Sequence, residues 1–278
     1  MRPRHLIACT LGFLWLAMTG AAVSAAAPPP AGKPTYFGVF GIPPDKAHDW
    51  PFTVSRAGPE DMSQLQGAGL KGLVALTGSK KNYSDASGCF QLDMWKQALD
   101  RHDAAHIRSL VDQGVLLGLY AIDEPHDWPC GPSFEDIDAA CAYAGQKWPT
   151  LKCGVNAPPA WLKPGASKLT HVGFLFFQYS NKKGTPAEWL KEQLADAGWF
   201  HGDIWLSIQL LQPRLSVSEF RNAGLTFCNA RPAGLLMWKW SDEWFAQPGV
   251  SAAMREVANA CASTAALAGA ASRGPRTP

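Results

Sequence analysis

The sequence predicts one α/β domain folded as a (β/α)8 barrel of the TIM type, and three observations support this prediction. Apolar, strand-like runs alternate with helical segments and are joined by short loops, which is typical of a parallel sheet covered by helices. The roughly 250 residues that remain without the N-terminal apolar segment can bury one large core, a length that suits a single α/β barrel as well as it suits two small domains. No Gly-x-Gly-x-x-Gly motif or P-loop follows a strand-like run, which weakens the alternative of a nucleotide-binding open sheet.

The strands are predicted from short, continuous apolar runs, as expected when both faces of a strand are covered. In chain order they are residues 36–42, 72–78, 117–123, 151–156, 171–179, 203–210 and 234–240. A closed barrel needs eight strands, and about seven are recognisable. We therefore expect a missing or degenerate strand in the long segment between Gly78 and Leu116, and we interpret residues 43–53 as a loop.

The helices are predicted from apolar residues at helical spacing and from capping residues at their starts. Ser133, Thr185 and Ser216 each precede an acidic first turn, which is typical of a helix N-terminus. The first predicted helix begins near Ser55 or Pro59, and two helical stretches follow between residues 92 and 111. Further helices begin at residues 133, 185 and 216, and the last covers residues 251–268.

The two ends of the chain are predicted to lie outside the barrel. Residues 1–25 begin with positive charge, continue with an apolar run and end in small residues, as in a secretory signal peptide. Residues 26–34 form a proline-rich leader, residues 35–268 the single catalytic barrel domain, and residues 269–278 a disordered tail. We expect a secreted or periplasmic protein.

Charge bears on the class of binding partner, and cysteine content bears on disulfides and metal sites. Without residues 1–25, Lys and Arg number 23 and Asp and Glu number 23, so no basic surface for nucleic acid or an anionic membrane is expected. Six cysteines remain after Cys9 is removed, and an even number in an exported protein indicates disulfides. Their spacing matches no zinc motif and the histidines are scattered, so we expect no metal. We also expect a monomeric protein that works without a cofactor.

The segment 117–125 is the strongest candidate for the centre of a functional site. Its apolar run ends in Asp123 and Glu124, and Pro125 ends the strand because proline cannot donate a ladder hydrogen bond. Barrel enzymes keep their chemistry at such carboxyl ends of strands. The plainer alternative is an acidic loop that caps the next helix.

Polar and aromatic side chains follow several other predicted strands, and a barrel gathers them on one face. The candidate substrate-binding residues are Asp49, Tyr83, His126, Trp128, Asn156, Gln178, Tyr179, Trp238 and Trp240. Aromatic rings can stack on the apolar faces of a sugar, while carboxylates and amides bind its hydroxyl groups. A carbohydrate is therefore the expected partner.

Glycoside hydrolysis requires one carboxyl group that donates a proton and a second that acts as nucleophile or base. We assign the proton donor to Glu124. Asp123 should point to the opposite side of the strand, where it could bind the ligand or raise the pKa of Glu124 by charge repulsion. Asp242 or Glu243, after the last strand, is the first choice for the second carboxylate, with Asp49 in reserve.

From about Tyr36 to Trp244 the chain resembles glycoside-hydrolase-type barrels of secreted proteins. The resemblance lies in Tyr-x-Ile-Asp-Glu-Pro at 120–125, Gly-Leu-Val-Ala-Leu-Thr-Gly-Ser at 72–79 and Met-Trp-Lys-Trp at 237–240. In the large retaining glycosidase clan the fourth strand ends in Asn-Glu-Pro, and its Glu, matched by Glu124, is the acid/base. Asp123 replaces the Asn, and residues 204–212 hold no acid to match the clan's nucleophile, so the resemblance does not imply a retaining mechanism.

Two other functions stay open. The same aromatic residues would serve a non-catalytic carbohydrate-binding barrel, which would differ from an enzyme in the separation of its carboxylates. A serine or metal hydrolase is a weaker alternative, because the sequence has no Gly-x-Ser-x-Gly or His-Glu-x-x-His motif.

Overall fold

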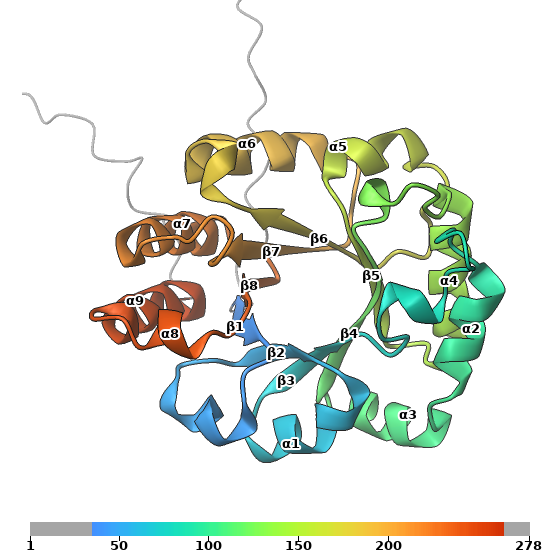
Figure 1. Ribbon diagram of the computed structural model, residues 1–278, viewed down its shortest axis with the longest axis horizontal. Coiled ribbons are helices and arrows are strands. Elements are labelled where there is room, and N and C mark those ends of the chain that lie inside the picture. Colours follow the sequence, from blue (N-terminus) through green and yellow to red (C-terminus); the bar gives the residue numbers. More distant parts are fainter. Residues whose placement is uncertain (1–34, 264–278) are drawn as a thin grey trace, which may run out of the picture. The chain divides into compact units, whose positions relative to one another are not determined.

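The computed structural model describes residues 35–263, and these form a closed barrel of eight parallel strands in sequence order, with β8 pairing back to β1 (Figure 1). The strands are β1 (Tyr36–Phe40), β2 (Val54–Ala57), β3 (Lys71–Val74), β4 (Leu116–Asp123), β5 (Lys152–Asn156), β6 (Phe174–Tyr179), β7 (Asp203–Gln209) and β8 (Gly234–Trp238). The predicted TIM-type (β/α)8 barrel is therefore confirmed.

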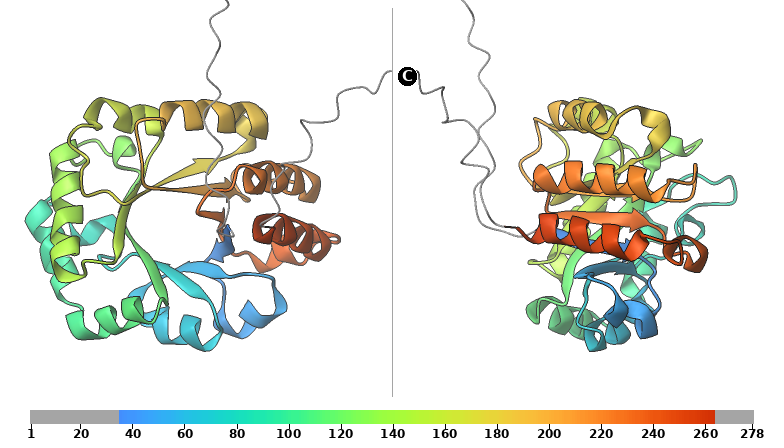
Figure 2. Two further views of the ribbon diagram at one scale, coloured as in Figure 1. Left: turned by 180° about the vertical axis from the view of Figure 1, so that it is seen from behind. Right: turned by 90° about the vertical axis from the view of Figure 1, so that its left-hand side faces the viewer.

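Helices surround the ring of strands, as Figures 1 and 2 show from three directions. They are α1 (Met62–Gly67), α2 (Leu92–Asp100), α3 (Ala104–Asp112), α4 (Phe134–Lys147), α5 (Pro159–Leu162), α6 (Pro186–Asp196), α7 (Val217–Asn229), α8 (Asp242–Phe245) and α9 (Val250–Ala262). The predicted caps form: the hydroxyl oxygens of Ser133 and Ser216 each accept a hydrogen bond from the N–H of the third helix residue, and the N–H of each serine donates one to that residue's carboxylate.

The prediction of where the missing strand lies was wrong. Residues 78–116 hold α2 and α3 and a short 3-10 turn, whereas the strand absent from the sequence pattern is β2, in the region where we expected a loop and a helix start. Only four residues pair there, and two of them, Ser55 and Arg56, are polar. The Ser55 hydroxyl donates to the Val39 carbonyl oxygen at 2.7 Å, so β2 depends on its neighbours rather than on an apolar run.

Large side chains fill the inside of the barrel. Phe40, Tyr120, Phe174, Phe176 and Trp205 belong to this inner cluster and are all buried. Glycines make room for them: a Cβ atom at Gly154 would lie 2.3 Å from the Phe174 ring, and one at Gly234 would lie 2.1 Å from the Trp205 ring. Because the interior is closed by these rings, a ligand can be received only at an end of the barrel.

The six cysteines of the barrel pair as Cys89–Cys130, Cys141–Cys153 and Cys228–Cys261, which confirms the prediction of disulfides. The last of these joins α7 to α9, which lie side by side in Figures 1 and 2. Three disulfides are typical of an oxidising compartment. Within residues 35–263, no helix has the length and apolar character needed to cross a bilayer.

Three predicted segments fall outside the part of the chain that is described. They are the signal peptide at residues 1–25, the leader at residues 26–34 and the tail at residues 269–278.

Candidate functional site

A cavity of about 960 Å³ opens at the carboxyl ends of β1, β2, β3, β4 and β8. Five acidic residues line it, together with Arg56, several other basic residues and aromatic rings. The acids are Glu60, Asp61, Asp123, Glu124 and Asp127. This is the end of the barrel at which barrel enzymes carry out their reactions.

Asp123, the last residue of β4, is held firmly in the site. Its Oδ1 accepts hydrogen bonds from the Tyr120 hydroxyl and from Asn156 Nδ2, both at 2.7 Å. Its backbone carbonyl accepts a third bond from Trp128 Nε1 at 3.1 Å. Asn156 is buried at the end of β5, so two neighbouring strands orient this carboxylate.

Glu124 has a left-handed backbone conformation, with φ 45° and ψ 53°, which is uncommon for a residue with a side chain. Its N–H donates to the Asn156 carbonyl oxygen at 2.9 Å, so pairing with β5 continues up to this residue. The strand alternation then breaks, and Glu124 lines the same cavity as Asp123. The expectation that the two acids point to opposite sides was therefore wrong, because it assumed an extended backbone through Glu124.

The surroundings of Glu124 raise the pKa of its carboxyl group above the usual value. Burial is the main cause, and the negative charges of Asp123 and Asp127 add to it. Lys183 and Lys80 act in the opposite direction. A raised pKa keeps a carboxyl group protonated to a higher pH than usual, which favours a role as proton donor.

An aromatic wall stands beside these acids. The rings of Tyr83 and Trp128 stack with centroids 5.9 Å apart, and Lys80 Nζ lies 5.5 Å from the centre of the Trp128 ring. Burial raises the pKa of the Tyr83 hydroxyl. Both rings line the cavity, so the structure brings together these two candidate binding residues.

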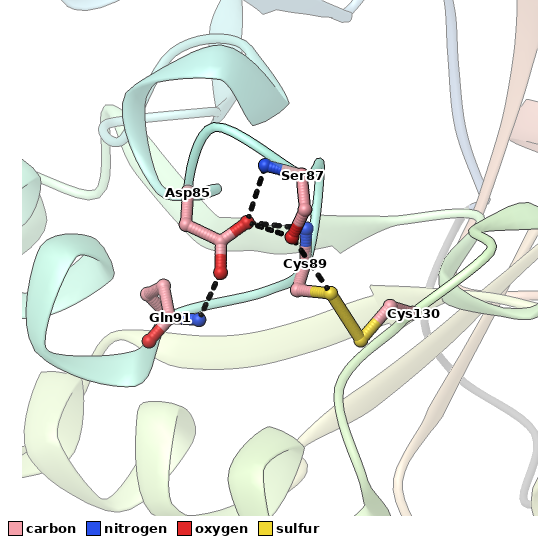
Figure 3. Close-up of a disulfide and its surroundings, with 5 residues drawn as sticks. All are labelled: Asp85, Ser87, Cys89, Gln91 and Cys130. Carbon is pink, nitrogen blue, oxygen red and sulfur yellow. Dashed lines mark hydrogen bonds between the residues drawn. A yellow bond between two sulfur atoms is a disulfide. The ribbon is translucent and has the colours of Figure 1, made fainter.

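The Cys89–Cys130 disulfide ties the loop that carries Tyr83 to the loop that carries Trp128. Figure 3 shows how the first loop is braced: Asp85 accepts hydrogen bonds from Ser87 and from the Cys89 N–H, and its other oxygen accepts one from Gln91. The Phe90 N–H also donates to the Cys130 carbonyl oxygen at 3.0 Å. A covalent link thus joins the two loops that carry the aromatic wall of Tyr83 and Trp128.

The remaining candidates on β4, β5 and β6 take different positions. His126 is half-buried, and its pKa is lowered, chiefly by burial. Gln178 donates from Nε2 to the Ser207 hydroxyl at 3.3 Å, and Asn156 supports Asp123. Tyr179 is buried against helix residues, with its hydroxyl on the Gly184 carbonyl oxygen, and is not among the residues that line the cavity.

Among the candidates at and after the end of β8, the two tryptophans lie in the cavity and the two acids lie outside it. Trp238 and Trp240 line the cavity. Asp242 forms an ion pair with Lys46 and has a side chain that is 71% exposed, whereas Glu243 pairs with Arg214 at 2.6 Å and is 78% exposed. Asp49 is also exposed. These three acids are not among the residues that line the cavity.

Arg56 is a residue of the site that the sequence interpretation missed. It lies on β2 and lines the cavity, as do Glu60 and Asp61 after the same strand. The only signal is that Val54 and Arg56 stand two positions apart, as residues on one face of a strand do, and four residues are too few for periodicity to identify a strand.

At the end of β7, where the retaining clan would carry its nucleophile, the chain has an amide. Gln209 is 9% exposed, and its Oε1 accepts a hydrogen bond from the Leu211 N–H at 3.2 Å. Among residues 35–263, no group of three or more His, Cys, Asp or Glu side chains is arranged to hold a metal ion.

Comparison with solved structures shows similarity to glycoside hydrolase barrels. An endo-1,4-β-D-mannanase from Thermotoga petrophila has a TM-score of 0.58 and 12% identity, over 81% of this chain and 99% of its own. An endo-β-1,4-xylanase of glycoside hydrolase family 10 from Gloeophyllum trabeum has a TM-score of 0.55 and 13% identity, over 84% of this chain and 98% of its own.

The catalytic domain of the major endoglucanase of Xanthomonas campestris has a TM-score of 0.52 and 10% identity, over 81% of this chain and 94% of its own. No family model matches the chain, and a search of curated proteins finds no match. The chain thus shares its fold with glycoside hydrolases, as the sequence resemblance implied, and similarity at this level of identity is evident in the fold alone.

Proposed function

We propose that this protein is a glycoside hydrolase that cleaves a poly- or oligosaccharide, with Glu124 as the general acid. One observation supports this most directly: a half-buried carboxyl group with a raised pKa lines a cavity at the carboxyl end of β4. Trp238 and Trp240 line the same cavity, are partly exposed and would stack on sugar rings, whereas Tyr83 and Trp128 are buried in its wall.

In the proposed reaction Glu124 protonates the leaving oxygen of the glycosidic bond while the bond to the anomeric carbon breaks. We assign the second carboxylate to Asp123 in preference to Asp242 and Glu243. Asp123 lines the cavity and is oriented by Tyr120 and Asn156, whereas the other two acids are exposed and ion-paired. A base at Asp123 would activate a water molecule for attack on the anomeric carbon.

A non-catalytic carbohydrate-binding barrel is the second candidate, and Gln209 is the observation that favours it. An amide cannot serve as the nucleophile of a retaining enzyme, and the Gln209 side chain is already engaged with its own loop. The partly exposed rings of Trp238 and Trp240 would bind sugar equally well without a reaction.

We further propose that the protein is exported and monomeric and that it works without a cofactor or metal. The three disulfides support export to an oxidising compartment. Nearly equal numbers of acidic and basic residues support a carbohydrate partner over a nucleic acid or a membrane surface.

The test is hydrolysis of a panel of plant and microbial polysaccharides by the purified protein and by Glu124→Gln, which keeps the size of the side chain. We expect the parent to release sugar and the variant to lose about a hundredfold or more of that activity, because the proton donor is gone. The matched control is Glu243→Gln, which removes an exposed acid outside the cavity and should leave the rate unchanged.

Equal activity of the parent and Glu124→Gln would show that Glu124 has only a structural role. Binding of glycan by both proteins, with no hydrolysis by either, would support the carbohydrate-binding barrel instead.

A further inference from the structure

Arg56, on β2, presents a positive charge to the cavity. Its guanidinium carbon lies 4.4 Å from the centre of the Tyr120 ring, 5.2 Å from that of Phe40 and 6.0 Å from that of Trp238. The three rings come from β1, β4 and β8, so the side chain is held in place by packing against aromatic faces. Its position is therefore defined before any ligand binds.

The guanidinium of Arg56 forms no ion pair and no side-chain hydrogen bond with any described residue, and its buried Nε is among the polar atoms without a partner. Two other arginines of the barrel differ: Arg214 pairs with Glu243, and Arg221 pairs with Glu256. A guanidinium has five N–H donors and remains charged at any physiological pH. Leaving the buried Nε unpaired is costly unless a ligand or a bound water molecule satisfies it.

None of the five acids that line the cavity forms an ion pair with Arg56. Tyr120 contacts both groups: its ring packs against the Arg56 guanidinium, and its hydroxyl donates a hydrogen bond to Asp123. Lys80, above Trp128, adds a second positive charge to the lining of the cavity. The cavity lining is thus mixed in charge: Glu60 and Asp61 follow β2, while Arg56 and Lys80 contribute positive charge.

We propose that the glycan bound in this cavity is acidic and that the carboxylate of a uronic acid residue pairs with Arg56. This inference rests on the proposed function, because it names the substrate class of the same site. The planar fork of a guanidinium matches a carboxylate in a bidentate arrangement. A sugar stacked on Trp238 would lie beside Arg56, so stacking and charge pairing could act on the same ring.

The experiment measures binding by calorimetry at neutral pH with matched ligands. Oligomers of galacturonate, glucuronate and mannuronate are each used as the free acid and as the methyl ester, which keeps the sugar and removes its charge. A sulfated neutral galactan oligosaccharide is the third kind of ligand. The proteins are the parent, Arg56→Gln and Arg255→Gln; the last removes the same charge from an exposed position on α9.

We expect the parent to bind at least one free acid about tenfold or more tightly than its methyl ester. Arg56→Gln should lose this preference and Arg255→Gln should keep it. The comparison of acid with ester in the parent stands even if Arg56→Gln does not fold, which its thermal unfolding will show.

The inference is overturned if the parent binds no free acid, binds acid and ester equally, or prefers the sulfated ligand, and equally if Arg56→Gln keeps the preference. Its failure can be told from that of the proposed function. Glu124-dependent hydrolysis of neutral glycans without an acid preference would retain the hydrolase and reject the uronate. A preference for the free acid without any hydrolysis would retain the uronate inference and reject the hydrolase.

Discussion

The ends of β4 and β7 lie on different sides of the same barrel mouth and differ in almost every respect. The β4 end has two consecutive acids, a left-handed backbone at Glu124 and a carboxyl pKa raised by burial. The β7 end has an amide, Gln209, that is buried and accepts a hydrogen bond from its own loop. Strain and uncompensated charge are thus concentrated at β4, while β7 is locally satisfied.

This difference bears on the mechanism. Backbone strain and a buried carboxyl group both reduce stability, and they persist where the surrounding structure enforces them, as at active sites. The retaining clan that the sequence resembles needs acids at both strand ends, and here only β4 has them. A reaction in this cavity would therefore depend on the β4 side, with Asp123 beside Glu124.

The largest effect, on the free energy of unfolding, is expected from removing disulfides: Cys89–Cys130 near the β4 end and Cys228–Cys261 on the helix that follows β7. Cys89→Ala with Cys130→Ala opens a link that spans 41 residues, and Cys228→Ala with Cys261→Ala opens one that spans 33. By loop entropy each pair should lower the free energy of unfolding by about 4 kcal/mol, as measured by denaturant titration. Only the first pair should also weaken glycan binding, because it supports the wall of Tyr83 and Trp128. Equal losses of binding would contradict this difference between the two sides.

A smaller effect is expected when each strand end is given a glycine. Glu124→Gly removes a Cβ from a left-handed residue and should raise the free energy of unfolding by up to about 1 kcal/mol, despite the added freedom of the unfolded chain. Gln209→Gly, at the end of a regular strand, should lower it by about 1 kcal/mol or more, since packing is lost and nothing is relieved. Changes of the same sign at both positions would show that Glu124 is not strained.

The smallest effect concerns the pH dependence of hydrolysis. Glu124 donates a proton only in its protonated form, so the rate should fall as pH rises through the raised pKa of this carboxyl group. Lys183→Met removes a positive charge that opposes the rise, and should move this fall to higher pH. Asp127→Asn removes a negative charge that favours it, and should move the fall to lower pH.

The pH profile of kcat/KM measures both shifts. Lys182→Met, at the exposed neighbouring position, is the control and should leave the profile in place. Shifts in one direction for both Lys183→Met and Asp127→Asn would rule out Glu124 as the group that titrates.

Much of the fold was predictable from the sequence because its signals are local. The apolar run 116–123 followed by Pro125 predicts β4 and places two acids at its end, since proline ends the ladder wherever it occurs. Ser133 and Ser216 predict helix starts because a cap needs only residues three positions away. The even number of cysteines likewise predicted disulfides without their pairing.

The tertiary structure decided the rest, because the interactions concerned join distant parts of the chain. β2 forms by pairing with β1 and β3, and the sequence of its four residues does not by itself predict a strand. Glu124 lines the same cavity as Asp123 because its backbone is left-handed rather than extended. Arg56 is held in the site by rings from three other strands. The sequence by itself determined which residues carry charge at the strand ends; closure of the barrel decided which of them share one cavity.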